Sequence, residues 1–225
     1  MSEDAWWRLS KEDVRARVAD VNDGVLAVAG LAEGLLLVLD THSLPAIVTV
    51  AATVGAVSIG GATYSEVAAE LEVQKDLIAA EQRLLELSPA EELDELVQHF
   101  QGKGVSEETA RRVADELNAA DALTAQLETE YGITELLTEV QPFKEGISAA
   151  VSFMFGAMVT VLIALVVPTV WVEEYILVGA ALSLTATAVI LSRLSGTRIW
   201  STIMRSLFIG LAALGTSFMV GSVLG

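Results

Sequence analysis

The sequence of 225 residues contains no cysteine. Disulfide bonds, thiolate metal sites and cysteine nucleophiles are therefore excluded. Histidine is nearly as scarce, since only His42 and His99 are present, and a histidine-rich zinc site is not expected. The sequence also lacks a Ser-His-Asp set, a phosphate-binding loop and the histidine motif of a metal hydrolase, so we do not expect an enzyme.

Basic residues are few: 13 Lys and Arg stand against 30 Asp and Glu, for a net charge of −17. Nucleic-acid binding is disfavoured, because phosphate recognition needs clustered Lys and Arg, and cations are the more natural partners. Yet 53% of the residues are hydrophobic and only 19% are charged, so apolar and acidic residues must be segregated along the chain. Residues 1–20 are charged and amphipathic and lack the features of a secretory signal.

The hydrophobic residues gather in five runs of the length that a membrane requires. About 20 helical residues cover the ~30 Å hydrocarbon core of a bilayer. Buried helices of a soluble protein are the alternative, but five helices with so few charges would have no polar face for water. The runs are 24–39, 44–62, 147–167, 176–191 and 207–224.

The distribution of Lys and Arg predicts the orientation of these spans. All 13 lie before the first run, between the second and third, or between the fourth and fifth, and segments 40–43 and 168–175 have none. Basic residues accumulate on the cytoplasmic side, so five spans with a cytoplasmic N-terminus are expected. The glycines and alanines of the spans favour close packing in a bundle or dimer.

We therefore predict an all-α membrane protein with five transmembrane helices and a cytoplasmic helical insert between spans two and three. The expected parts are a cytoplasmic amphipathic segment at 1–20, transmembrane helices 1–2 at 21–65, an acidic helical metal-binding domain at 66–142, and transmembrane helices 3–5 at 143–225.

Local signals predict four helices in the insert. The first continues from span two through 65–87, where neither Gly nor Pro interrupts the chain. Ser88 and Pro89 resemble a capping box with Pro in the first helical position, and that helix ends near 102–104. Ser106 is expected to cap a third helix to about residue 119, and Asp121 to begin a fourth that ends near Gly132.

The insert places carboxylates on shared helix faces. Residues 66–145 contain 20 acids and 6 bases. Acids three or four positions apart lie on one face, as Glu91 and Glu92 do with Glu95, while Glu130 follows Gln126 by one turn and Asp115 faces Arg111 or Arg112. Clustered oxygen ligands suit hard or borderline divalent cations. The alternative is a solvated acidic face in the protein of a salt-adapted organism.

Two carboxylates fall within the first apolar run or at its edge. Asp23 stands at the mouth of span one and Glu33 near its middle, where a charge costs at least a few kcal/mol and is usually functional. Asp23 instead caps the helix in one alternative, and in another Glu33 is protonated or pairs with a polar residue of a neighbouring span.

Other side chains are candidates for the same path. Thr63 and Glu66 stand at the cytoplasmic end of span two. Met154 and Met158 lie one turn apart in span three, so that their sulfurs are able to line a route for a transition metal. Packing in the core or against lipid is the alternative for both methionines.

Four segments, taken in order, resemble those of a known family. The first is Asn22-Asp23-Gly24 with Gly30-Leu31, and the second is 58–65, at the end of span two. The third comprises Pro89, the Glu-rich helix and 104–114, and the fourth comprises 141–144 with Ser152-Phe153 and Gly156-Ala157. They are similar to the vacuolar iron transporter family of iron and manganese transporters. The resemblance implies a homodimeric exporter that moves Fe²⁺ or Mn²⁺ out of the cytosol, usually in exchange for protons. It also implies that Asp23 is the central pore carboxylate and that the insert binds metal through Glu81, Glu92, Glu95 and Glu130.

The chain departs from that family at several positions. The family's glutamate at the end of span two falls on Thr63, its nearby methionine on Ile59, an insert methionine on Gln126 and a further insert glutamate on Leu84. We expect Glu33 or Glu66 to supply the missing pore charge.

Two hypotheses follow. The first is an Fe²⁺ or Mn²⁺ transporter with proton antiport, whose partners are divalent metal ions, protons, the lipid bilayer and a second copy of the chain, with no nucleic acid and no prosthetic group. The other is a membrane-anchored acidic protein that senses or buffers cations, or docks partners, without transport. Arg outnumbers Lys and acids are abundant, which favours the cell membrane of a salt-adapted prokaryote.

Overall fold

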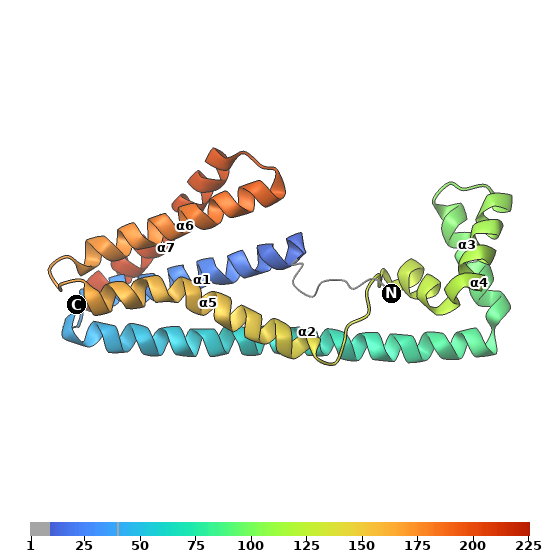
Figure 1. The fold of residues 1–225 in the computed structure, drawn as a ribbon, viewed down its shortest axis with the longest axis horizontal. Coiled ribbons are helices and arrows are strands. Elements are labelled where there is room, and N and C mark those ends of the chain that lie inside the picture. Colours follow the sequence, from blue (N-terminus) through green and yellow to red (C-terminus); the bar gives the residue numbers. More distant parts are fainter. Residues whose placement is uncertain (1–9, 40) are drawn as a thin grey trace. The chain divides into compact units, whose positions relative to one another are not determined.

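The computed structural model describes residues 10–39 and 41–225, and every regular element in this part of the chain is a helix. The all-helical prediction is confirmed. The predicted segment 1–20 lies partly outside the described residues, and from Lys11 onward it already belongs to the first helix. The elements are α1 (Lys11–Leu36), the 3₁₀ turn η1 (Thr41–Ser43), α2 (Leu44–Leu87), α3 (Pro89–Gly102), α4 (Glu107–Tyr131), α5 (Gln141–Val166), α6 (Val172–Ser195) and α7 (Ile199–Leu224) (Figure 1).

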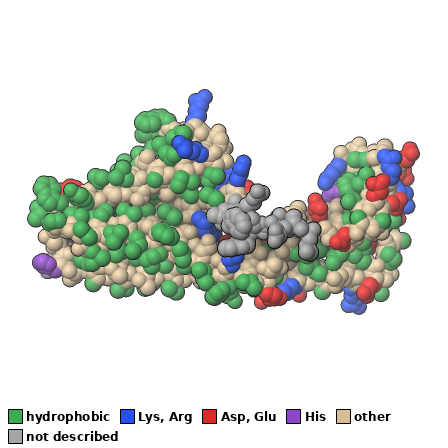
Figure 2. Space-filling model, viewed as in Figure 1, with side chains coloured by type: hydrophobic (Ala, Val, Ile, Leu, Met, Phe, Trp, Pro, Cys, Tyr) green, Lys and Arg blue, Asp and Glu red, His purple; other side chains and the backbone are tan. Residues whose placement is uncertain are grey.

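The chain forms two compact units. The first consists of Met1–Tyr64 and Phe143–Gly225, and the second of Ser65–Pro142. Helices α1, α5, α6 and α7 belong to the first unit, and α3 and α4 to the second, while α2 contributes to both. Hydrophobic side chains cover the visible face of the first unit, and Asp and Glu gather on the second (Figure 2).

Four helices in the described part of the chain are long and apolar enough to cross a membrane: α2 with the turn before it, α5, α6 and α7. Helix α1 is not among them, so the five-span topology stays a prediction. Asp20, Asp23 and Glu33 interrupt its apolar character.

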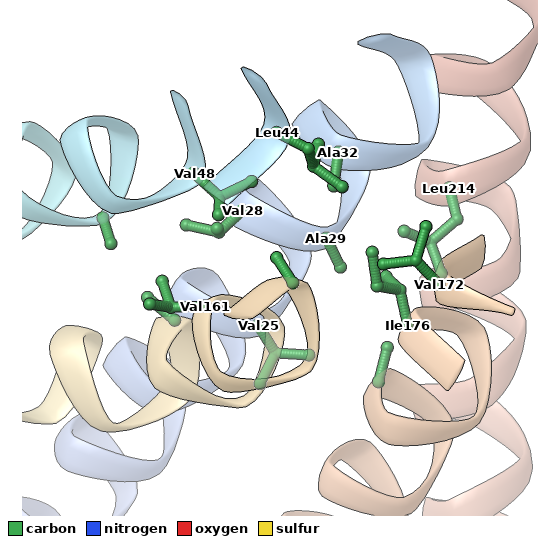
Figure 3. Close-up of a cluster of buried hydrophobic side chains, with 14 of the residues drawn as sticks. Val25, Val28, Ala29, Ala32, Leu44, Val48, Val161, Val172, Ile176 and Leu214 are labelled. Atoms are coloured by element: carbon green, nitrogen blue, oxygen red, sulfur yellow. The ribbon is translucent and has the colours of Figure 1, made fainter. Parts of the chain in front are cut away.

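The core of the first unit nevertheless centres on α1. Its Val25, Val28, Ala29 and Ala32 are buried among side chains of α2, α5, α6 and α7 (Figure 3). A helix that other helices surround needs no continuous apolar face of its own toward lipid, which explains how α1 tolerates carboxylates.

Helices α1 and α5 cross with their backbones in contact. A Cβ atom added to Gly24 would overlap the carbonyl oxygen of Phe153, and one added to Gly156 would overlap that of Val21. Small residues permit this approach in a membrane, where van der Waals packing drives helix association.

The second unit follows its local signals except at its two predicted serine caps. Ser106 precedes α4 as predicted, but among the described residues its side chain makes no capping hydrogen bond. Helix α3 begins at Pro89 as predicted. The capping-box prediction is wrong, because among the described residues the side chain of Ser88 makes no capping hydrogen bond. The φ and ψ of Ser88, −136° and 50°, are not those of a capping residue. Helix α4 is kinked at Asp121, whose Oδ1 accepts from the Thr124 backbone N–H at 3.1 Å, as a new helix start requires. Gly132 ends α4 with a φ of +69°.

Candidate metal-handling sites

Asp23 lies in the middle of a continuous helix. Helix α1 begins at Lys11 with Ser10 as its cap, and Ser10 and Asp13 exchange both hydrogen bonds of a capping box. The alternative in which Asp23 caps the helix is therefore wrong. A carboxylate in this position is not needed for the backbone, which is satisfied by the helix itself.

A cavity of about 210 Å³ lies beside Asp23. It is enclosed by α1, α6 and α7, and its wall combines polar and apolar groups. The neighbouring Asn22 is fixed from α6, because the Thr187 hydroxyl donates to Asn22 Oδ1 at 2.6 Å. The lining residues are Ala19, Asn22, Asp23, Leu26, Leu184, Ser206 and Ile209.

A small ion-pair cluster lies one to two turns before Asp23. The guanidinium of Arg17 contacts Asp20 of its own helix and Glu145 of α5, each at 3.5 Å. Arg17 also donates to the Glu145 carbonyl oxygen at 3.2 Å. These side chains are largely buried, so the cluster joins the beginning of α5 to α1.

Glu33 lies near the end of α1 and not near the middle of a span, because the helix ends at Leu36. Its side chain is buried, and it lines a different cavity from Asp23, together with Glu173 of α6. The structure thus places Asp23 and Glu33 in separate cavities.

The other predicted path residues do not join these cavities. Thr63 lies in the first unit and Glu66 in the second, on the same helix α2. Met154 packs against the apolar core, and Met158 is exposed on the surface of α5. Neither methionine lines the cavity of Asp23 or that of Glu33.

The second unit brings two predicted ligands together. Glu81 of α2 is fully buried and Glu92 of α3 nearly so. Within 10–39 and 41–225, no donor reaches either carboxylate oxygen of Glu81. By contrast, Gln126 of α4 donates to the Glu92 backbone oxygen at 2.6 Å and to the Glu92 Oε2 at 3.3 Å. The amide of Gln126 therefore holds Glu92 in place beside Glu81.

The carboxylates of this unit raise one another's pKa values. Burial, followed by the adjacent Glu92 carboxylate, raises the pKa of Glu81 to about 7. Burial and the charges of Glu92 and Glu130 also raise the pKa of Glu95. Burial and the hydrogen bond to Glu130 raise the pKa of Tyr131 to about 12.

Glu95 and Glu130 line a cavity of about 150 Å³ with His99, Gln126 and Thr129. Among the residues that the structure describes, however, no three His, Asp or Glu side chains converge closely enough to hold one ion. The buried pair of Glu81 and Glu92 is therefore the nucleus of the candidate site, and Glu95 and Glu130 are its acidic surroundings.

Sequence reasoning missed several residues of these sites. Thr187 and Asn22 are 165 positions apart, and no local pattern pairs them. Glu173 was open to detection, because it is a carboxylate at the edge of the fourth apolar run in a segment without Lys or Arg. The role of Gln126 as a buried donor to Glu92 had no signal in the sequence.

Comparison with known proteins agrees with the arrangement of these helices and carboxylates. A vacuolar iron transporter of Acanthamoeba castellanii (strain ATCC 30010 / Neff) is 30% identical over 174 residues, which are 77% of this chain and 63% of that protein. The chain thus spans less than two thirds of the length of this relative. The profile of the VIT family matches residues 14–222, which is nearly the entire chain. The protein is therefore an integral membrane protein that belongs to the VIT family, a family of transporters.

Proposed function

We propose that the protein exports divalent transition-metal ions, Fe²⁺ or Mn²⁺, from the cytosol in exchange for protons. The observation that carries the proposal is Asp23, a carboxylate in the middle of α1 that lines a cavity between three helices of the membrane unit. Carboxylates at such positions mark ion pathways, because they are too costly to retain without a use.

In this proposal α1 is a fifth span, with the N-terminus and the acidic unit on the cytosolic side. The acidic unit gathers cations from the cytosol, and the buried pair of Glu81 and Glu92 is its strongest site. Two facing carboxylates hold either a proton or a cation between them, so metal and protons compete. A homodimer in the cell membrane of a prokaryote completes the proposal.

The decisive experiment is transport into proteoliposomes that contain a pH-sensitive dye. We expect Fe²⁺ or Mn²⁺ to enter while the interior becomes more alkaline, because protons leave as metal enters. Asp23→Asn keeps the size of the side chain but removes its charge, and we expect it to reduce metal entry about 100-fold or more.

Glu12→Gln is the matched control, since Glu12 is an exposed acid on the same helix that pairs with Arg15. Its transport should equal that of the wild type. Absence of metal movement in the wild type, with Mn²⁺ still bound by the protein, would instead favour a membrane-anchored cation sensor or buffer. Metal movement without a change of internal pH would refute proton exchange and leave export standing.

A further inference from the structure

A second cavity of about 290 Å³ lies near the end of α1 that is remote from its N-terminus. It is enclosed by the same three helices as the cavity of Asp23, namely α1, α6 and α7. Two of its lining residues are acidic and, in the part of the chain that the structure describes, none is basic. The lining residues are Glu33, Glu173, Leu177, Leu211, Leu214, Gly215 and Phe218.

Glu33 is buried in this wall, and one of its carboxylate oxygens has no hydrogen-bond partner among the described residues. Only 3% of its surface is exposed, and the described residues place no hydrogen-bond donor at its buried Oε1. A buried, unpaired carboxylate costs several kcal/mol, which a cation or a proton must offset. Glu173 and Glu174 lie within electrostatic range and add negative charge, so the surroundings make this cost larger.

The described part of the fold makes no hydrogen bond to Oε1 of this carboxylate. Glu33 occupies the last turn of α1, where the partial negative charge of the helix end opposes it. The nearby backbone is satisfied by other groups, since the Ser217 hydroxyl of α7 donates to the Gly30 carbonyl oxygen. The side chain neither caps the helix nor completes a protein hydrogen bond through Oε1.

We propose that Glu33 and Glu173 form a second cation site, distinct from Asp23, that binds a divalent cation retaining most of its water. Two carboxylates with several water ligands suit a hard ion such as Mn²⁺ or Mg²⁺. Glu173 is exposed at the beginning of α6, and it therefore links the buried Glu33 to the surface. A site with so few protein ligands binds weakly and releases its ion readily.

The position of this site gives it a role that rests on the proposed function. Glu33 follows Asp23 by ten residues, or about 15 Å along the helix axis. Since both cavities lie against α1, α6 and α7, an ion that leaves Asp23 along this seam meets Glu33 and Glu173 next. The pair is then the release site on the outer side of the membrane.

Mn²⁺ binding to the full-length protein in nanodiscs tests the site directly, because electron paramagnetic resonance measures free Mn²⁺. The background is the variant Asp23→Asn, Glu81→Gln, Glu92→Gln, which silences the other candidate sites. Adding Glu173→Gln should weaken the remaining binding about tenfold, and adding Glu33→Gln should abolish it. Glu174→Gln is the matched control, because Glu174 is adjacent but does not line the cavity, and its effect should be below threefold.

Unchanged Mn²⁺ affinity and stoichiometry in both Glu33→Gln and Glu173→Gln would overturn the proposal. Glu173 is exposed, so its substitution keeps the test valid even if Glu33→Gln fails to fold. Measuring transport in the otherwise wild-type chain distinguishes the proposed second site from the proposed transport function. Transport without Mn²⁺ binding at this pair refutes the site and leaves the function, whereas binding without transport supports the site and refutes the function.

Discussion

The two units arrange their carboxylates differently. In the first unit, Asp23 and Glu33 lie ten residues apart on one helix, and each lines its own cavity. In the second unit, Glu81 and Glu92 come from two helices and are buried next to each other. When carboxylates are separate, an ion binds first to one and then to the next, and water molecules supply its remaining ligands. A facing pair retains one proton or one cation between its members. The first arrangement suits passage and the second suits capture.

The largest expected effect is a loss of stability in the first unit, where two helix backbones are in contact. Gly156→Val places a side chain where the α1 backbone lies, so we expect it to destabilise the first unit by about 3 kcal/mol or more. Size-exclusion chromatography and thermal unfolding in detergent should show little monodisperse protein. Gly215→Val in α7 is the control, because a Cβ added to Gly215 meets no described atom within 4 Å beyond its own helix backbone. Normal behaviour of both variants would contradict the backbone contact between α1 and α5.

A smaller effect concerns the buried pair and its pH dependence. Because the pKa of Glu81 is raised from 4.5 to about 7, its contribution to stability is complete below about pH 4.5 and is lost as the pH rises through 7. Glu81→Gln removes this loss of stability. We expect the variant to unfold at a temperature several degrees above that of the wild type at pH 8, because a gain of about 2 kcal/mol in the free energy of unfolding has this effect in a chain of this size.

Thermal unfolding between pH 5 and pH 8, without and with Mn²⁺, measures this difference. Mn²⁺ should stabilise the wild type at pH 8 more than at pH 5, because a protonated pair does not bind metal. Glu86→Gln on the exposed face of the same helix serves as the control. Equal slopes of stability against pH in the wild type and in Glu81→Gln would contradict the buried pair.

The smallest effect belongs to charges at the surface of the second unit. Arg111 pairs with Asp94, but the two side chains are 53% and 57% exposed. Arg111→Ala should therefore cost no more than about 0.5 kcal/mol, and less at high salt. Chemical unfolding at low and high salt, with Arg112→Ala for comparison, measures the loss. A cost above about 1 kcal/mol would show that exposed and buried charges differ less here than we infer.

Local chemistry explains which parts of the fold the sequence predicts. Pro89 begins a helix because its ring fixes φ. The Asp121 side chain accepts from the backbone three residues later, and Gly132 adopts a positive φ. Each of these features depends on a few adjacent residues. The start of α1 carries such a signal too, in Ser10 and Asp13, but it lies 14 residues before the apolar run that begins at Gly24, so the apolar run alone does not indicate where α1 starts.

The sites were less predictable because they depend on contacts between distant segments. The individual carboxylates of the insert were identified, but the burial of Glu81 beside Glu92 is decided by how α2, α3 and α4 pack. Likewise, Glu33 was noticed as a charge in an apolar run, while its cavity with Glu173 requires α1, α6 and α7 together. Helical spacing does not contain this information.

The contact of backbones at Gly24 and Gly156 has a consequence for motion. Helices that touch through main-chain atoms have no side-chain rotamers with which to adjust, so α1 and α5 form a rigid pair. Helix α7 also meets α1 through main-chain atoms, since a Cβ atom added to Gly221 would overlap the carbonyl oxygen of Gly34. The contact of α1 with α6 is different, because side chains and two cavities lie along it. In the proposed transporter, we therefore expect alternating access to the two sides of the membrane to involve movement of α6 against α1, α5 and α7, with Asp23 and Glu33 on the part that stays still.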